Sequence, residues 1–144
     1  MEEKCKPDDP AIENSEQLLR RIPDRHYRNG RILHGAFEGF RLSAEREKDS
    51  SPELCLAHMY PDGFKENKVK KTVEKLLKKN WTVASFITEI PRNFGQTVYP
   101  DVKVTVVNKP FDNEAHVEVC GIKDDDLLED LCDNAKIVLE KSEQ

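Results

Sequence analysis

Apolar and polar residues alternate along three stretches of the chain, the pattern of strands that bury one face. These stretches are FRLSAE (40–45), VKVTVV (102–107) and AHVEVCG (115–121). A fourth stretch, WTVASFI (81–87), is rich in β-branched and aromatic residues and predicts a strand buried on both faces. The hydrophobic pattern therefore predicts three or four strands.

Two longer segments carry apolar residues at helical spacing. In residues 66–79, Val69, Val73, Leu76 and Leu77 form one apolar face, and Asn80 is suited to end the helix. The second segment starts at the acidic residues 124–126, which suit the positive end of a helix dipole, and is predicted to continue to about residue 139. A shorter helix is predicted to open at "SPEL" (51–54) and to stop before Pro61.

These elements predict a small α+β domain with three or four mostly antiparallel strands packed by two or three helices. Residues 15–22 are interpreted as a short amphipathic segment that Pro23 ends, and residues 88–95 as connecting structure that could include a helical turn. A chain of 144 residues fits one domain. Residues 1–16 have few apolar side chains and are expected to form a flexible acidic leader, residues 17–139 the single domain, and residues 140–144 a frayed tail.

Charge and cysteine content indicate a soluble cytoplasmic protein. The formal net charge is −5, and no apolar run approaches the roughly 18 residues that span a bilayer. The N-terminus has no apolar core of a signal peptide. The four cysteines, at positions 5, 55, 120 and 132, form no C-x-x-C pair and are interpreted as free thiols. We expect stability to depend on neither oxidation nor metal, and we expect no cofactor.

Positive charge is concentrated in "RRIPDRHYRNGR" (20–31), which holds five arginines and one acid. The planar guanidinium group binds phosphate and carboxylate through a fork of donors. The arginines could pair with the chain's own carboxylates, as we expect for Arg25 and Arg28, or bind a phosphate-bearing ligand, as we expect for Arg20, Arg21 and Arg31. Lysines 68, 71, 75, 78 and 79 form a second basic stripe, but the acidic net charge argues against nucleic acid as a partner.

His116, Glu118 and Cys120 share one face of the strand predicted at 115–121, at intervals of about 6.5 Å. His116 is the side chain best suited to move protons near neutral pH, and Ser43 could meet a histidine in space. The H-x-E pattern lacks the P-C-x-x-C of zinc deaminases. A zinc site completed by His34 or His58 is the alternative, but we predict no metal site. Glycine-rich phosphate loops are absent.

Several motifs together resemble an uncharacterised bacterial family of small cytoplasmic proteins. They are LLRRIPDRHYRNGR (18–31), GAF…FRLS (35–43), TVASF (82–86) and FDNEAHVEVCG (111–121), and the chain departs from the family pattern at Glu114, where proline is expected. The resemblance implies no activity. It marks six positions of interest: Arg20, Arg21, Arg31, Ser43, Asn113 and His116.

Three functional hypotheses follow. The leading one is a non-catalytic binding or accessory module, a monomer or weak dimer with a protein partner. The alternative is an enzyme or sensor for a phosphate-bearing, nucleotide-like small molecule, with Arg20, Arg21, Arg31 and Asn113 as ligand-binding residues and His116 and Ser43 as catalytic residues. The third is nucleic-acid binding. The sequence leaves open whether the protein is an enzyme.

Overall fold

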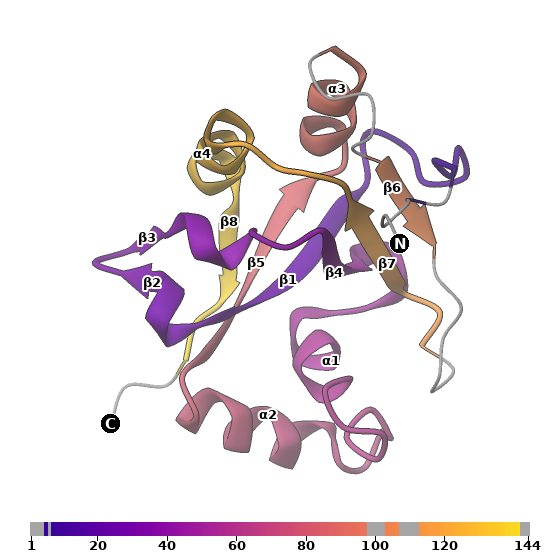
Figure 1. The fold of residues 1–144 in the computed structure, drawn as a ribbon. Helices are drawn as coiled ribbons and strands as arrows, with labels where there is room; N and C mark the ends of the chain where they lie inside the picture. Colours follow the sequence, from indigo (N-terminus) through magenta and orange to yellow (C-terminus); the bar gives the residue numbers. More distant parts are fainter. Residues whose placement is uncertain (1–4, 6, 98–102, 107–112, 142–144) are drawn as a thin grey trace.

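A six-stranded antiparallel sheet forms the centre of the protein (Figure 1). The computed structural model describes residue 5 and residues 7–97, 103–106 and 113–141. In spatial order the strands are β6 (Lys103–Val106), β7 (His116–Cys120), β4 (Arg41–Arg46), β1 (Gln17–Pro23), β5 (Trp81–Ile87) and β8 (Lys136–Leu139). A separate hairpin pairs β2 (Tyr27–Arg28) with β3 (Arg31–Ile32). The predicted α+β class is confirmed, with more strands than the three or four expected.

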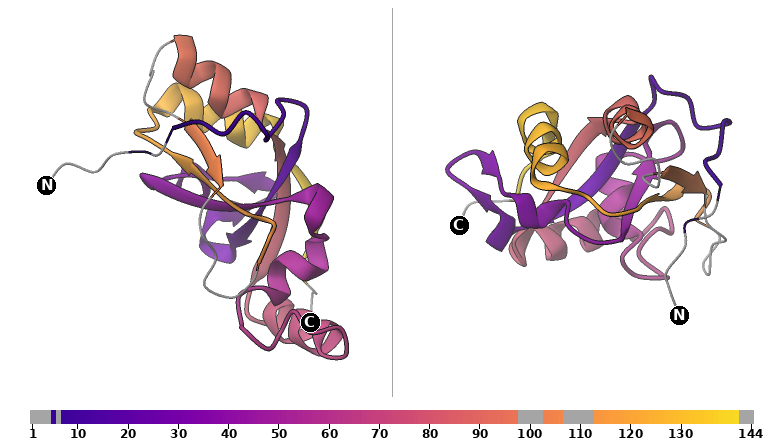
Figure 2. Two further views of the ribbon diagram at one scale, coloured as in Figure 1. Left: turned by 90° about the vertical axis from the view of Figure 1, so that its right-hand side faces the viewer. Right: turned by 45° about the horizontal axis from the view of Figure 1, so that its top comes forward.

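Helices cover both faces of this sheet. Helices α3 (Glu89–Thr97) and α4 (Asp125–Asn134) lie on one face, and α1 (Pro52–Ala57) and α2 (Val69–Lys78) on the other (Figures 1 and 2). The central strand β1 serves both faces: Leu18 and Ile22 join the core beneath α4, whereas Leu19 joins the core beneath α1 and α2. Three short 3-10 helices, η1 (Asp24–His26), η2 (His34–Ala36) and η3 (Glu47–Asp49), complete the connections.

The helix ends follow the local sequence signals. Ser51 caps α1, its Oγ accepting a hydrogen bond from the Leu54 amide at 3.1 Å. Asp124 caps α4 through the Leu127 amide at 3.0 Å. After α2 the chain turns at Asn80, whose φ of 71° is the left-handed conformation that asparagine tolerates at a helix end. These three predicted helix boundaries are confirmed.

Two of the predicted elements need correction. Residues 17–23 form the strand β1, because their apolar side chains pack on both faces of the sheet instead of along one helical stripe. The helix predicted at 124–139 ends at Asn134, and residues 136–139 form the edge strand β8 paired with β5. In addition, α3 (Glu89–Thr97) is longer than the single helical turn allowed for within the connecting structure expected at 88–95.

Residues 8–16 pack on the domain, which corrects the expectation of a flexible leader for this part of the chain. Ile12 is fully buried in the core between the sheet and α4. Arg46 forms a two-pronged ion pair with Glu16, at 2.8 and 2.7 Å. Arg92 donates to the carbonyl of Ile12 at 2.6 Å and pairs with Asp8 at 3.1 Å. The carboxylates of this segment therefore serve as partners for two buried arginines.

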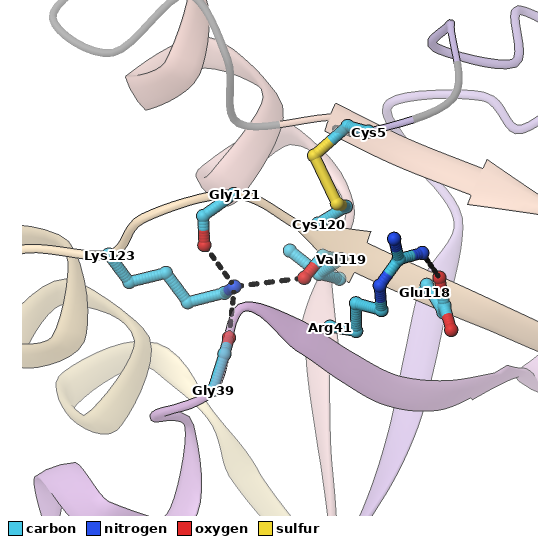
Figure 3. Close-up of a disulfide and its surroundings, with 8 residues drawn as sticks. All are labelled: Cys5, Gly39, Arg41, Glu118, Val119, Cys120, Gly121 and Lys123. Carbon is cyan, nitrogen blue, oxygen red and sulfur yellow. Dashed lines mark hydrogen bonds and ion pairs between the residues drawn. A yellow bond between two sulfur atoms is a disulfide. The ribbon is translucent and has the colours of Figure 1, made fainter. Parts of the chain in front are cut away.

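A disulfide joins Cys5 to Cys120 at the end of β7 (Figure 3). This contradicts the expectation that all four cysteines are free; among the described residues, Cys55 and Cys132 are the free thiols. Beside the disulfide, Lys123 Nζ donates to the carbonyls of Gly39, Val119 and Gly121 at 2.7–2.9 Å. Burial lowers the pKa of Lys123 to about 8.

The C-terminal residues 140 and 141 contact the body of the protein. The Tyr27 hydroxyl donates to Glu140 at 2.9 Å, and Lys141 Nζ lies 2.8 Å from the Asp24 carboxylate. Residues 142–144 of the expected frayed tail lie outside the described residues. Within the described ranges, none of the helices has the length and apolar composition needed to cross a membrane.

Candidate functional site

Arg28 and Arg31 lie next to each other at the tip of the β2–β3 hairpin. The two residues between them, Asn29 and Gly30, have φ values of 52° and 77°, as a two-residue type I′ turn requires. Arg28 and Arg31 are register partners across the hairpin, so their side chains leave it on the same face. The Asn-Gly turn thus holds two guanidinium groups side by side.

This hairpin borders a hollow along α4, which we call the hairpin groove. It comprises two cavities of about 480 and 230 Å³ that share Arg31, Ile32 and Cys132. The larger cavity is lined by Arg28, Asn29, Arg31, Ile32, Leu33, His34, Glu129 and Cys132. The groove therefore combines apolar side chains and cationic side chains of the arginine-rich stretch with two carboxylates of α4, Glu129 and Asp133.

Glu129 is the acidic side chain that faces these cations in the larger cavity. Its Oε2 lies 2.6 Å from His34 Nε2, and its Oε1 lies 3.8 Å from Arg31 Nη2. The hydrogen bond with His34 holds the pKa of Glu129 below its ordinary value. Arg28 forms no ion pair with any described residue, and the Arg31 side chain is 73% exposed. The guanidinium groups are therefore only partly neutralised by the protein itself.

Arg20, predicted to bind ligand, contacts the backbone instead. Its Nε donates to the carbonyl of Ala36 and its Nη1 to the carbonyl of Ser43, both at 3.1 Å. Burial is the main reason that the pKa of Arg20 falls to about 10. The side chain bridges η2 and β4, which helps to fix the segment that follows the hairpin.

A second cluster of polar side chains surrounds Glu45 on the sheet face that carries α1. The Glu45 side chain is 3% exposed, and its Oε2 contacts His58 Nδ1. Ser50 Oγ and Asn113 Nδ2 donate to the same oxygen at 3.3 and 3.4 Å. Arg21 Nη1 lies 3.8 Å from Glu45 Oε1 and donates to the carbonyl of Cys55 at 3.3 Å. We call this group, together with His116, the Glu45 cluster.

His116 is the cross-strand partner of Glu45, so the two side chains share a face of the sheet. Burial lowers the pKa of His116, an effect that Glu45 opposes. Ser43 lies two residues before Glu45 on the same face, opposite Glu118. Glu118 in turn lies 3.6 Å from Arg41. The polar face of β4 and β7 thus continues from the Glu45 cluster towards the disulfide.

The structure brings together three of the six predicted site residues, Arg21, Asn113 and His116, with Ser43 nearby on the same face. Arg20 lies on the other face of the sheet, and Arg31 lies in the hairpin groove. The arginine stretch is therefore divided among three environments rather than forming one site.

Metal ligation finds no support in the arrangement of these side chains. No group of three or more His, Cys, Asp or Glu residues within the described ranges is placed to hold a metal ion. The zinc alternative required His34 or His58, but these pair with Glu129 and Glu45 respectively. Cys120 is occupied by the disulfide.

The sequence predicted neither Glu45 nor Glu129 as a site residue, and it named His58 only as a possible zinc ligand. Arg28 was expected to pair with the chain's own carboxylates, but it forms no ion pair with a described residue. The sequence does not mark Glu45, which occupies an ordinary polar position of the alternating strand; only the structure shows that this residue is 2% exposed. A charged side chain at such a position needs a partner. His58 follows α1 directly, and nothing in its sequence context points to β4.

No family model matches this chain, and the searches of curated proteins and of solved structures also give no match. The resemblance to an uncharacterised bacterial family therefore stays a prediction.

Proposed function

We propose that the protein is a non-catalytic binding module whose hairpin groove takes a phosphate-bearing small molecule. The observation that carries this proposal is the pair of guanidinium groups, Arg28 and Arg31, held on one face of the hairpin beside a cavity of about 480 Å³. This proposal joins the binding module of the leading hypothesis to the phosphate-bearing ligand of the alternative one. Arg28 takes the ligand-binding role that was expected for Arg20 and Arg21.

Charge supports an anion as the ligand. Like charges at facing positions of a strand pair destabilise each other, so an anion between Arg28 and Arg31 would relieve their repulsion. Arginine forks match phosphate oxygens in pairs, and hydrogen bonds to charged groups contribute about 1.5–3 kcal/mol each. The apolar side chains of Ile32 and Leu33 line the same cavity and would contact the rest of the ligand.

Glu129 gives the proposal a sharp test, because it competes with the ligand for Arg31 and His34. Titration calorimetry with inorganic pyrophosphate and with AMP should detect binding that weakens between about 50 and 200 mM salt. Arg31→Ala should weaken binding by about tenfold or more. Glu129→Gln should strengthen it, since the substitution removes a negative charge beside the anion.

Arg25→Ala is the matched control, because Arg25 belongs to the same stretch but does not line the groove. Its affinity should equal that of the parent. Equal losses in Arg25→Ala and Arg31→Ala would point to nonspecific charge attraction and contradict the proposal. Tighter binding of short oligonucleotides than of pyrophosphate, with a steep salt slope, would favour the nucleic-acid hypothesis instead.

The bacterial cytoplasmic location that the family resemblance implies is part of the same proposal. Cytosolic thiol systems keep most cysteines reduced. The location therefore predicts a reduced Cys5–Cys120 pair in cells and an oxidised pair after purification in air. Alkylation of intact cells before lysis, followed by mass spectrometry, measures this directly, and a disulfide present before lysis would count against the cytoplasm.

A further inference from the structure

The two cavities of the hairpin groove carry opposite unpaired charges. Arg28 lines the larger cavity and forms no ion pair with a described residue. Asp133 lines the smaller cavity, and its carboxylate likewise forms no ion pair within the described part of the chain. Arg31 lines both cavities, and Glu129 lies 3.8 Å from its guanidinium group. The groove therefore has an available cation in one cavity and an available carboxylate in the other.

We propose that the ligand of this groove is an aminoalkyl phosphate, a phosphate monoester that also carries a protonated amine. The inference rests on the proposed function, because it keeps the phosphate at Arg28 and Arg31 and adds a second contact, from the amine to Asp133. A ligand with negative charge alone would meet the carboxylates of Glu129 and Asp133 without compensating either of them. An amine offsets this repulsion, since a charged group taken out of water needs a partner of opposite sign.

The C-terminal end of α4 reinforces the preference for a cation in the smaller cavity. Asp133 is the last residue but one of α4, and Ala135, which follows the helix, lines the same cavity. The carbonyl groups at this end of a helix carry partial negative charge, so a cation is favoured there and a carboxylate is not. Glu129 lies one turn before Asp133, and like charges at that spacing destabilise a helix. The last turn of α4 contains no basic side chain, so the amine of the ligand would supply the missing positive charge.

The junction between the two cavities suits the carbon chain of the ligand. Besides Arg31, Ile32 and Cys132 line both cavities, and Ala135 and Ile137 line the smaller one. Burial, together with the charges of the nearby α4 carboxylates, raises the pKa of Cys132 to about 11, so the thiol is uncharged near neutral pH. The junction thus offers uncharged contacts between an anion site and a cation site. A short alkyl chain with a phosphate at one end and an amine at the other matches this arrangement.

Two guanidinium groups favour a monoester over a diester as the phosphate. A monoester has one more terminal oxygen and more negative charge than a diester, and arginine forks bind phosphate oxygens in pairs. Because the phosphate of a phospholipid headgroup is a diester, the ligand class is the free monoester and not a membrane lipid.

Titration calorimetry of the full chain, at about 50 mM salt and neutral pH, compares inorganic pyrophosphate, ethyl phosphate, phosphoethanolamine and glycerophosphoethanolamine. Ethyl phosphate and phosphoethanolamine differ only in the amine. The parent should bind phosphoethanolamine about fivefold more tightly than ethyl phosphate, which corresponds to the upper value for an exposed ion pair. Glycerophosphoethanolamine carries the same amine on a diester and should bind more weakly than phosphoethanolamine.

Substitutions of Asp133 test the contact with the amine. Asp133→Asn should remove the advantage of phosphoethanolamine, so that both esters bind with similar affinity. Asp133→Lys should make ethyl phosphate the better ligand, because the smaller cavity then repels the amine. Asp130→Asn is the matched control: it removes the same charge from α4, but Asp130 does not line the groove, so the preference should remain. Both aspartates are exposed, and thermal melting of each variant shows whether it is folded.

The outcomes separate this inference from the proposed function. If the parent binds pyrophosphate but binds ethyl phosphate and phosphoethanolamine equally well, the inference is overturned and the phosphate site stands. A preference that survives in folded Asp133→Asn, or that is lost equally in Asp130→Asn, also overturns it. Binding of glycerophosphoethanolamine as tight as that of phosphoethanolamine would overturn the assignment to a monoester. If neither pyrophosphate nor either monoester binds, the proposed function itself fails, and the inference fails with it.

Discussion

Removing the Cys5–Cys120 disulfide should destabilise the protein substantially. The bond joins residues 115 positions apart, so it closes a loop of most of the chain. Without it, the unfolded chain gains conformational entropy and the free energy of unfolding falls. Cys5→Ser is the cleanest perturbation, because it leaves the buried Cys120 side chain in place.

The magnitude follows from the size of the closed loop. For a loop of 115 residues, the chain-entropy relation gives about 16 cal/mol/K, or about 4.8 kcal/mol at 25 °C. Native disulfides typically contribute 2–5 kcal/mol when measured, so this value is near the upper limit. With an unfolding entropy of about 0.3 kcal/mol/K for 144 residues, the melting temperature should fall by roughly 7–16 °C.

Circular dichroism melts of four samples test this: the oxidised parent, the reduced parent, Cys5→Ser, and Cys5→Ser with reductant. The last three should melt together, below the oxidised parent. Reductant should not affect Cys5→Ser, because Cys55 and Cys132 are already free thiols. Cys132→Ser is the matched control and should melt near the parent. Melting of the reduced parent and Cys5→Ser within 2 °C of the oxidised parent would refute the reasoning and restore the expectation of an oxidation-independent fold.

Three further predictions concern the core, a close contact and a surface ion pair. Leu131→Asp should unfold the domain, because it puts an unpaired charge into a fully buried position, whereas Ile122→Asp, at a 68% exposed position, should melt near the parent. Gly35→Ala should cost about 1–3 kcal/mol, since the new Cβ would clash with the His26 ring, and His26→Ala should remove most of that cost in a double-mutant cycle. Hydrogen bonds from Arg46 lower the pKa of Glu16 below its ordinary value of 4.5. The stabilisation that this ion pair gives the folded state is therefore present above pH 4.5, and it is lost as the pH falls through the lower folded-state pKa. Urea unfolding should therefore show that Glu16→Gln is less stable than the parent at pH 7 and that the difference shrinks below about pH 4; a constant difference would contradict this.

Local patterns predicted the elements whose two faces differ. The strands β4 and β7 alternate, and α2 has a single apolar stripe, so each was visible in the sequence. In β1 the apolar residues Leu18 and Leu19 are adjacent because both faces are covered, and no alternation is left to detect. For β8, the apolar residues of 135–139 continue the stripe of α4, and only pairing with β5 makes them a strand.

The candidate sites were predictable only in part, because they depend on contacts between distant segments. Arg21 and His116 were predicted as site residues separately, and the structure places both beside Glu45, which was not predicted. The hydrogen bond from His58 to Glu45 depends on how α1 docks on the sheet, which no local pattern encodes. Likewise, the Cys5–Cys120 disulfide joins positions 115 residues apart, and no local pattern encodes such a pairing.

The central position of β1 has a consequence during synthesis of the chain. This strand is made first, but its longest partner, β5, ends at Ile87. At about 5–20 residues per second, the roughly 60 residues between them take about 3–13 s to translate. Throughout that interval the nascent segment QLLRRIP lacks the strand that pairs along its whole length, because β4, which is made earlier, pairs with it only at Leu18 and Leu19. Charges beside apolar residues suppress association between chains, so Arg20 and Arg21 would protect the nascent protein before they take up their contacts in the fold.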